Sequence, residues 1–443
     1  MCLVSGWTRF KDPTGGGAPR RIIDMLKNYI KLAFKVMLRK KYFTFLTLVG
    51  ISFTIMIITI TAAFIDQIVG ASDTEPNRGR TLVLKEVFLM KDDRGRPDEV
   101  SLPFLQRYIT TLRTPERISI YRDGGYVSAR NGVPRAHRLK YSDENFWSIT
   151  NFKFLEGRPF DARQVKNASR VVVISEELKD YYFGEGNAAG KIIELFGIPF
   201  RVIGVVKSAP LLSDAGSDAW IPYTADPAPV PPPAEWPTIH GQYKAMLLAR
   251  SGEDAEKVKA EIDARMRKIV PPNPQFTSVK ANALTALQHF AKVRNSDPDP
   301  DFAQLFTALF ACLFLFLLIP VISLINLNIS RISERAAEIG VRKSFGASSS
   351  TLAGQFIVEN IILTLTGGLI GVILAYLFSD ALILMLNAFD PLFQISFGQF
   401  ILSWRVVAFC IGCCCFFGFL SGVYPAYRMS KMHPVNALKG NNL

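Results

Sequence analysis

Long uncharged stretches and charged ones follow one another along the 443-residue chain. The first uncharged stretch, 42–64, has 23 residues, and the second, 302–329, has 28 with Pro320 inside it. About 20 predominantly apolar residues suffice for a helix to cross the bilayer core, and membrane helices tolerate a proline kink. Two further apolar stretches lie at 356–378 and 406–423. The pattern predicts an α-helical membrane protein with four transmembrane helices.

A cleaved signal peptide is the alternative for the first stretch. Its 23 uncharged residues exceed the apolar region of such peptides, which is about 7–15 residues long. No A-x-A cleavage site follows it. A transmembrane helix is therefore favoured.

The 237 residues of 65–301 read as a charged globular segment. Alternating and β-branched stretches predict strands, and charged periodic stretches predict helices at 176–182 and 254–268. The strands are expected at 81–90, 171–174, 245–249 and 276–279, as a meander over 118–141 with turns at Asp123-Gly124 and Asn131-Gly132, and as two strands over 192–206 around a Gly-Ile-Pro turn. An α+β extracytoplasmic domain between helices 1 and 2 is the prediction.

A proline-rich stretch interrupts this segment. Six of the 12 residues in 226–237 are Pro. Such a stretch serves as an extended connector or as a Pro-rich recognition motif, and the connector is favoured.

The net charge of +13 is distributed unevenly. Residues 1–41 hold 10 Lys and Arg against two acids, 65–301 hold 33 against 31, and 302–443 hold eight against five. A nucleic-acid partner would need a basic patch on a soluble domain, and the largest such segment is nearly neutral. The charge therefore argues against nucleic-acid binding.

Basic residues close to the predicted spans indicate orientation. They gather before the first span, between spans two and three, and in the tail, whereas 379–405 carries Arg405 alone. Cytoplasmic loops carry the excess of Lys and Arg. Both termini, including the tail 424–443, and the loop 330–355 are thus expected in the cytoplasm, with 65–301 and the short loop 379–405 outside.

The segment before the first span is amphipathic. Lys27, Lys31, Lys35 and Arg39 recur every four residues, and apolar residues recur on another face of 25–41. Such a helix lies in the membrane interface or serves as a simple positive-inside anchor. Residues 1–24 are expected to be a flexible leader, and Met25 is an alternative start.

Catalytic, metal and cofactor signals are weak. The stretch 184–191 (GEGNAAGK) lacks the first Gly and the final Ser or Thr of a phosphate-binding loop. The four His show no metal-ligand spacing and no G-x-S-x-G elbow occurs. Cys410 and Cys413 have C-x-x-C spacing, but four thiols on successive turns of a span would face different directions. No cofactor, metal or catalytic residue is predicted.

Small residues recur inside the last two spans. Gly367 and Gly371, and again Gly418 and Gly422, stand four residues apart. This spacing lets helix backbones approach closely in lipid, so they are predicted to form packing seams, within the chain or between two copies. Glu359 is the one acid inside a span. Such an acid is a functional candidate, but its place near the end of the span favours an interfacial role.

Two motifs resemble a known family. Residues 333–348 (SERAAEIGVRKSFGAS) are similar to the E-R-x-x-E-I-G-x-R-K-x-x-G-A-S segment of the MacB/FtsX-type, or type VII, ABC transporter permeases. Residues 424–438 (YPAYRMSKMHPVNAL) are similar to the tail of that family, and 157–160, 171–176 and 183–205 resemble its MacB-like periplasmic core domain. The order of spans and external domain also matches, from about residue 25 onward.

The resemblance implies a permease that works with an ABC ATPase. No nucleotide-binding domain is recognised in this chain, so the ATPase is expected on a separate subunit and the chain is not expected to be an enzyme. A short helix over about 334–347 would dock on a separate ABC ATPase. The residues implied in this coupling are Glu334, Arg335, Glu338, Ile339, Gly340, Arg342, Lys343, Gly346 and Ala347. Glycine there permits close approach and a turn.

Two functions remain open. The first is export or extraction of a substrate such as a peptide, drug or lipoprotein from the outer side of a bacterial inner membrane. The second is an FtsX-like regulator that activates an external cell-wall hydrolase. The resemblance implies a second permease copy or homologue as partner, with a periplasmic adaptor as a further candidate for the first function. The large external segment favours transport.

Overall fold

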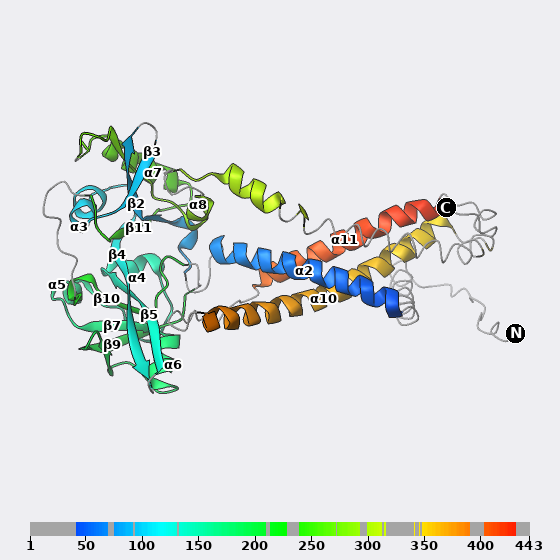
Figure 1. Cartoon of the computed structure of the whole chain (residues 1–443), viewed down its shortest axis with the longest axis horizontal. Helices are drawn as coiled ribbons and strands as arrows, with labels where there is room; N and C mark the ends of the chain where they lie inside the picture. Colours follow the sequence, from blue (N-terminus) through cyan, green and yellow to red (C-terminus); the bar gives the residue numbers. More distant parts are fainter. Residues whose placement is uncertain are drawn as a thin grey trace, which may run out of the picture. The chain divides into compact units, whose positions relative to one another are not determined.

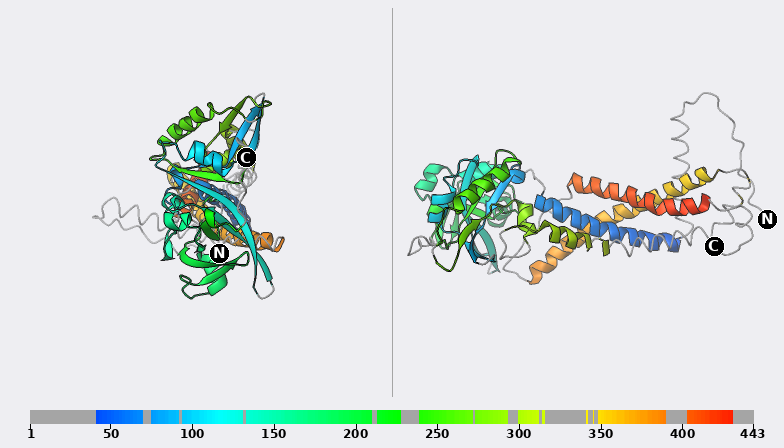
Figure 2. Two further views of the ribbon diagram at one scale, coloured as in Figure 1. Left: turned by 90° about the vertical axis from the view of Figure 1, so that its left-hand side faces the viewer. Right: turned by 90° about the horizontal axis from the view of Figure 1, so that it is seen from above.

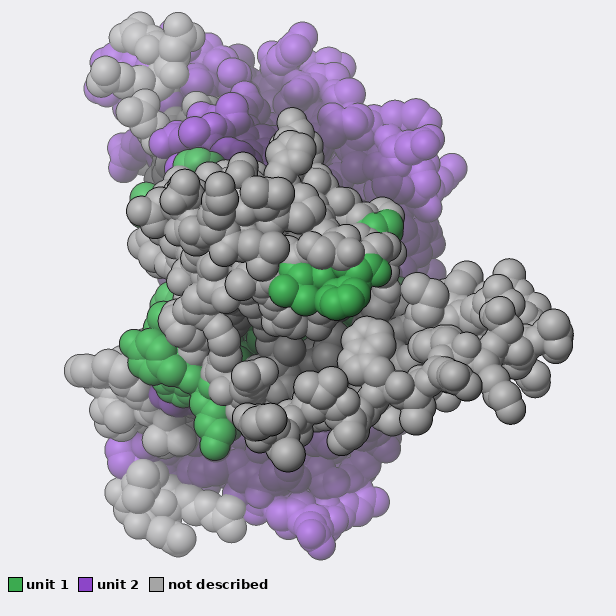
Figure 3. All heavy atoms as spheres, turned by 90° about the vertical axis from the view of Figure 1, so that its right-hand side faces the viewer, with its two compact units in different colours: residues 1–60, 313–377, 402–443 green, residues 61–312, 378–401 purple. Residues whose placement is uncertain are grey.

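The computed structural model describes residues 41–69, 75–91, 94–130, 133–209, 213–227, 239–271, 273–292, 299–311, 314–315, 341, 345, 348–389 and 403–430. The chain divides into two compact units, which Figure 3 shows in different colours. We call Met1–Ile60, Leu313–Leu377 and Leu402–Leu443 the helical unit, and Thr61–Cys312 and Phe378–Ile401 the mixed unit.

Three long helices run side by side in Figure 1 and again in Figure 2: α2 (Lys41–Val69), α10 (Ser349–Phe389) and α11 (Trp404–Ser430). Among the described residues, α2 and α10 contain stretches long and apolar enough to cross a membrane, Thr44–Asp66 and Ile357–Ser379. The described apolar helices Phe302–Ala311 and Trp404–Phe419 are shorter. Two of the four expected membrane helices are thus confirmed as helices of membrane length, and the other two stay predictions.

The end of α10 differs from the expectation. The helix begins at Ser349, inside the expected loop 330–355, and continues to Phe389, so the first part of the expected external loop 379–405 is helical. The reason lies in the sequence, because 381–386 is apolar and no Gly or Pro occurs between Gly371 and Pro391. The expected leader 1–24 and all but the last residue of the amphipathic helix 25–41 lie outside the described residues.

The described part of the mixed unit contains two sheets (Figure 1). A nine-stranded sheet has the order β1-β11-β4-β5-β10-β7-β9-β6, with β8 also paired to β9, and a three-stranded sheet has the order β12-β2-β3. Most pairs are antiparallel, but β10 with β5 and β7 with β9 are parallel. The strands are β1 (Thr81–Leu84), β2 (Glu86–Lys91), β3 (Arg94–Glu99), β4 (Arg117–Arg130), β5 (Val133–Ser142), β6 (Phe154–Gly157), β7 (Val171–Ser175), β8 (Ile192–Leu195), β9 (Ile198–Val206), β10 (Ala219–Pro222), β11 (Lys244–Leu248) and β12 (Ser278–Ala281).

Short helices connect the strands. They are α3 (Leu102–Phe104), α4 (Asn145–Thr150), α5 (Ala162–Lys166), α6 (Glu176–Phe183), α7 (Asp254–Met266) and α8 (Ala286–Ala291), with single turns η1 (Arg78–Arg80), η2 (Leu105–Ile109) and η3 (Tyr223–Ala225). The apolar face of α7 follows helical spacing, and its buried residues Val258, Ile262 and Met266 join the core beside β2 and β12. The expected mixture of strands and helices in this unit is confirmed.

The expected strand 81–90 is two strands in two sheets. Leu82 and Leu84 lie in β1, which pairs with β11, whereas Val87 to Met90 lie in β2, which pairs with β12 and β3. Lys85 stands between them, and its Nζ lies 2.5 Å from Asp214 Oδ1. Leu82 and Leu84 of β1 and Val87 and Leu89 of β2 nevertheless pack in one hydrophobic core.

The expected turn at Asp123-Gly124 was wrong, because both residues lie inside β4. Asp123 accepts hydrogen bonds from Lys140 and from Lys244, at 2.7 Å for the latter, on the neighbouring strands. A Cβ on Gly124 would lie 2.7 Å from the Tyr141 ring, so the absence of a side chain at Gly124 makes room for this ring. The strands β4 and β5 instead form one long hairpin around 131–132.

The turn between β8 and β9 also differs. The two strands are joined at Phe196-Gly197, both with positive φ (54° and 74°). Of the expected Gly-Ile-Pro turn, only Gly197 lies in the turn, because Ile198 and Pro199 already belong to β9. Positive φ at both central residues is the geometry of a two-residue hairpin turn that matches the twist of its strands.

The proline-rich stretch begins at a buried ion pair. Asp226 accepts a hydrogen bond from Arg122, whose guanidinium also lies 3.9 Å from the Tyr141 ring centroid. Residues 228–238, which include most of the expected connector, lie outside the described residues.

Candidate functional site

The first candidate site is the contact between α2 and α10. A Cβ on Gly367 would lie 2.7 Å from Ile51 Cγ2, and one on Gly371 would lie 2.6 Å from the backbone oxygen of Ser52. The Ser52 hydroxyl donates a hydrogen bond to the Gly367 carbonyl at 3.0 Å. The structure therefore places these two glycines against another helix of the same chain, where a larger side chain would not fit.

The second contact joins α10 and α11. A Cβ on Gly368 would overlap Cys414 Sγ, and one on Gly418 would overlap Thr364 Oγ1 and lie 3.0 Å from Ile361 Cα. Gly422 lies within α11, but its surroundings are outside the described residues. Glycine spacing indicated Gly418, whereas Gly368 stands outside the i, i+4 pairs and was missed.

A third contact, between α2 and α11, involves polar side chains. Thr59 Oγ1 and Cys410 Sγ lie 3.2 Å apart between α2 and α11. Cys410 and Cys414 are buried, Cys413 is half-buried and Cys415 is exposed. Residues three and four apart share one face of a helix, so Cys410, Cys413 and Cys414 lie on one side of α11, and the expectation that the four thiols face different directions was wrong for these three. Among the described residues, no group of three or more His, Cys, Asp or Glu is arranged to hold a metal ion.

Glu359 lies near the start of the membrane-length part of α10 and is 8% exposed. Its neighbours Asn360 and Thr364 are also buried, at 4% and 2%. The acid therefore belongs to a polar layer among the helices. Its interfacial role stays a prediction, because no bilayer surface is defined at this level.

The predicted coupling residues lie outside the described residues. This holds for all of Glu334, Arg335, Glu338, Ile339, Gly340, Arg342, Lys343, Gly346 and Ala347. Val341 and Phe345, which stand between these residues in the sequence, are described and are 43% and 88% exposed.

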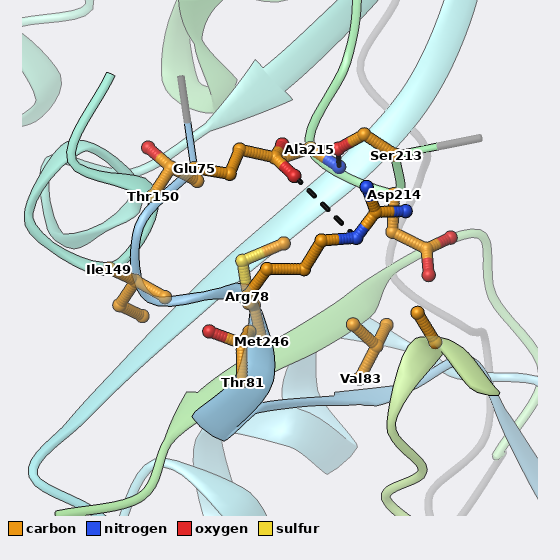
Figure 4. Close-up of a pocket in the computed structure, with 11 residues that line it drawn as sticks. Glu75, Arg78, Thr81, Val83, Ile149, Thr150, Ser213, Asp214, Ala215 and Met246 are labelled. Atoms are coloured by element: carbon orange, nitrogen blue, oxygen red, sulfur yellow. Dashed lines mark hydrogen bonds and ion pairs between the residues drawn. The ribbon is translucent and has the colours of Figure 1, made fainter. Parts of the chain in front are cut away.

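A small pocket lies in the mixed unit, directly after α2 along the chain (Figure 4). Its polar lining includes Glu75, Arg78, Ser213 and Asp214, and apolar residues such as Met246 close it. The cavity is about 30 Å³, which has room for a water molecule or two. Ligand pockets for drug-sized molecules are about 300–1,000 Å³, so a cavity of this size suits water alone.

Buried polar contacts fix this segment. Arg78 Nε lies 3.9 Å from Glu75 Oε2, and the Ser213 hydroxyl donates a hydrogen bond to the Glu75 carboxylate. Burial raises the pKa of Glu75, while Arg78 and the Ser213 hydrogen bond oppose that shift. Asn77 Nδ2 donates to the Ile149 carbonyl at 2.9 Å. The segment that follows α2 is thereby attached to α4 and to the 213–215 loop.

The loop that resembles a phosphate-binding loop holds an acid of its own chain. The amides of Ala188 and Ala189 donate to Glu156 Oε2 at 2.8 and 3.2 Å, and Lys179 Nζ lies 2.8 Å from Glu156 Oε1. Burial would raise the pKa of Glu156, but Lys179 and the two amides lower it overall. A carboxylate thus occupies the place where the amides would hold a phosphate.

The β4–β5 hairpin contains a buried histidine. His137 is 3% exposed, its Nε2 lies 2.8 Å from Ser128 Oγ, and the Tyr126 and Tyr181 rings flank it. Burial lowers the pKa of His137 to about 4. An unfolded chain takes up this proton near pH 6.5, whereas the folded chain does so near pH 4. His137 therefore costs stability as the pH falls from about 6.5 to 4.

We expect His137→Phe to flatten this acid dependence. Between pH 6.5 and 4 the variant should lose up to about 3 kcal/mol less stability than the natural chain. The difference between the two proteins is the readout, because burial raises the pKa of Asp143 to about 6, and its titration has the opposite sign in the same range. Thermal denaturation of the full chain at several pH values measures it. Parallel pH profiles would show that His137 does not titrate in this way.

Two family models match the chain. The MacB-like periplasmic core domain matches residues 44–265, and the FtsX-like permease C-terminal domain matches residues 310–434. The first covers half of the chain and includes most of the mixed unit.

Curated relatives agree with these models. The chain is 25% identical over 439 residues to a probable export ATP-binding/permease protein MacB of Pseudomonas entomophila, covering 96% of this chain and 61% of the relative. It is 26% identical over 299 residues to an uncharacterized ABC transporter permease, YvrN, of Bacillus subtilis, covering 67% and 68%. The chain thus spans less than two thirds of the length of the MacB relative.

Solved structures include similar external domains. The extracellular domain of the noncanonic ABC-type transporter YknZ from Gram-positive bacteria matches with 14% identity and a TM-score of 0.33, covering 46% of this chain and 99% of that one. The periplasmic region of MacB from Actinobacillus actinomycetemcomitans matches with 14% identity and a TM-score of 0.34, covering 49% and 96%. From the family models, the chain belongs to the MacB/FtsX-type ABC transporter permeases.

Proposed function

We propose that this chain is the permease subunit of an ABC transporter complex, in which a separate ATPase drives motion of the mixed unit. The complex exports or extracts a substrate from the outer side of a bacterial inner membrane. The chain itself hydrolyses no ATP, and it works with a second permease copy or homologue. A periplasmic adaptor is the expected external partner.

One observation carries the proposal. α10 begins at Ser349, directly after the predicted coupling segment, and its Gly367 and Gly371 lie against α2. α2 is one helix from Lys41 to Val69 and leads into the segment fixed at Glu75. A displacement of the coupling segment would pass along α10, across the glycine contact and along α2. Close-packed interfaces transmit such displacements because they do not deform continuously.

The charge distribution supports the orientation within this proposal. Basic residues before α2 and near α10 place both termini and the coupling segment in the cytoplasm by the positive-inside rule. The mixed unit then lies on the other side of the membrane. The name of the Pseudomonas relative, ATP-binding/permease protein, supports a link to ATP.

Reconstitution with the co-purified ATPase tests the coupling. We expect Glu338→Lys and Gly346→Pro to leave the chain in the membrane but to abolish its stimulation of ATP hydrolysis. Glu256→Lys is the matched control, because the Glu256 side chain is 76% exposed on α7, which belongs to the mixed unit. Unchanged stimulation with both coupling variants would contradict the assignment.

The FtsX-like match at 310–434 favours a second candidate function, activation of an external cell-wall hydrolase. The two functions differ in the partner on the outer side. Purification of the native complex from membranes distinguishes them, because an adaptor would support transport and a peptidoglycan hydrolase would support regulation.

A further inference from the structure

α8 exposes an aromatic side chain beside the outgoing end of α2. Phe290 is 41% exposed, and its ring meets the Phe64 ring edge-on with centroids 5.5 Å apart. Phe64 ends the 23-residue uncharged stretch, and Asp66 follows shortly after. The level of Phe64 is therefore where α2 passes from apolar to polar surroundings.

The last residue of α8, next to Phe290, is attached to the start of the next apolar helix. The Asp301 amide donates to the Ala291 carbonyl at 3.1 Å, and Asp301 Oδ1 accepts from the Gln304 amide at 2.9 Å. This Asp caps the helix Phe302–Ala311, on which Phe306 and Phe310 are 56% and 71% exposed. α8 is thus held at the level where two apolar helices begin or end.

Residues on both sides of Phe290 in the sequence are fixed to the sheets. His289 Nε2 lies 3.0 Å from the Val83 carbonyl, and Lys292 Nζ lies 2.5 Å from Glu86 Oε2. Thr285 and Gln288 form a capping box at its first turn. These contacts hold His289 and Lys292 toward β1 and β2, while Phe290 between them remains 41% exposed.

We propose that α8 rests on the bilayer surface at this level, with Phe290 inserted at the boundary between headgroups and acyl chains. Lipid is the occupant that the surface favours, because the exposed Phe290 ring continues an apolar surface that includes Phe64 and Ile65 of α2, 40% and 41% exposed. An apolar side chain at this depth gains free energy by leaving water. The mixed unit then has a direct contact with the membrane besides the helices that connect it to the helical unit.

Site-specific photocrosslinking tests this contact. The full chain with Phe290→p-benzoylphenylalanine is reconstituted into phosphatidylcholine vesicles, irradiated, and analysed by intact-mass spectrometry. We expect a lipid adduct, as from the same replacement at Phe53, which is 51% exposed on α2. The same replacement at Val127, 61% exposed on the β4–β5 hairpin, should give none.

The controls separate this inference from the membrane assignment. A lipid adduct at position 53 but not at 290 would overturn the α8 contact and leave α2 in the membrane. A crosslink from 290 to a second copy or to another protein would show that protein covers the ring, and would likewise overturn it. The proposal requires only that α2 lies in the membrane and does not depend on ATP coupling.

Discussion

Gly157→Ala is expected to destabilise the mixed unit by about 2–5 kcal/mol. Gly157 has a φ of 64°, and a Cβ at this position would overlap the backbone oxygen of Ile203 on β9. The left-handed conformation costs a residue with a Cβ about 1–2 kcal/mol. Crowding in a packed structure adds about 1–3 kcal/mol. The two costs act together because β9 cannot withdraw without breaking its pairs to β6 and β7.

Gly197→Ala is the matched control for this prediction. Gly197 also has a positive φ, 74°, but its nearest neighbour to a Cβ, Glu194 Oε1, would be at an ordinary 3.8 Å. Only the conformational cost of about 1–2 kcal/mol then applies. Chemical denaturation of the purified full chain, followed by the fluorescence of the buried Trp147 and Trp220, measures both. Equal losses in the two variants would show that the contact with β9 contributes nothing.

The same glycine explains part of the family motif. Gly157 pairs with Gly204 of β9, and a Cβ on Gly204 would lie 2.7 Å from the Arg158 backbone oxygen. Phe160, at the end of the motif, is 2% exposed in an aromatic cluster with Trp147 and Trp220. The motif at 157–160 thus brings two backbones together and then fills the core beside them. It serves the fold, and carries no chemistry of its own.

Local sequence patterns predicted the helices whose formation depends mainly on neighbouring residues in the chain. The apolar stretches 42–64 and 356–378 predicted α2 and α10, because a membrane-length apolar run leaves little alternative. The charged periodic stretch at 176–182 predicted α6, and the structure adds its cap, since Ser175 Oγ accepts a hydrogen bond from the Leu178 amide. The i, i+4 spacing of Gly367 and Gly371 indicated one face of one helix, although it did not identify α2 as the neighbour.

Features that depend on contacts between residues far apart in the chain could not be predicted from local sequence patterns. Asp123-Gly124 reads as a turn, but Lys140 and Lys244 bind the Asp123 carboxylate from neighbouring strands and keep it in β4. The small pocket of the mixed unit depends on Glu75 and Ser213, which are 138 residues apart in the sequence. Ser52 was missed for the same reason, since a hydroxyl inside an apolar span does not reveal which backbone carbonyl will accept its hydrogen bond.

Gly371→Leu is expected to separate α10 from α2 and to destabilise the helical unit by about 3 kcal/mol, the upper range for overpacking. The side chain would have to occupy the space of the Ser52 backbone oxygen, 2.6 Å from its Cβ, and of Ile55. A backbone atom of a helix cannot move aside as a flexible side chain can. Gly412→Leu on α11 is the control, because a Cβ there meets nothing within 4 Å. Unfolding of the purified chain in increasing dodecyl sulfate measures the difference.

The functional result of Gly371→Leu separates two steps of the proposed coupling. The change lies away from the predicted docking segment, so the ATPase should still co-purify with the variant. Transport should nevertheless fall, because the contact that passes motion from α10 to α2 is lost. Glu338→Lys should instead weaken the ATPase interaction itself. A Gly371→Leu variant that transports normally while α10 and α2 remain separated would show that motion reaches the mixed unit by another helix.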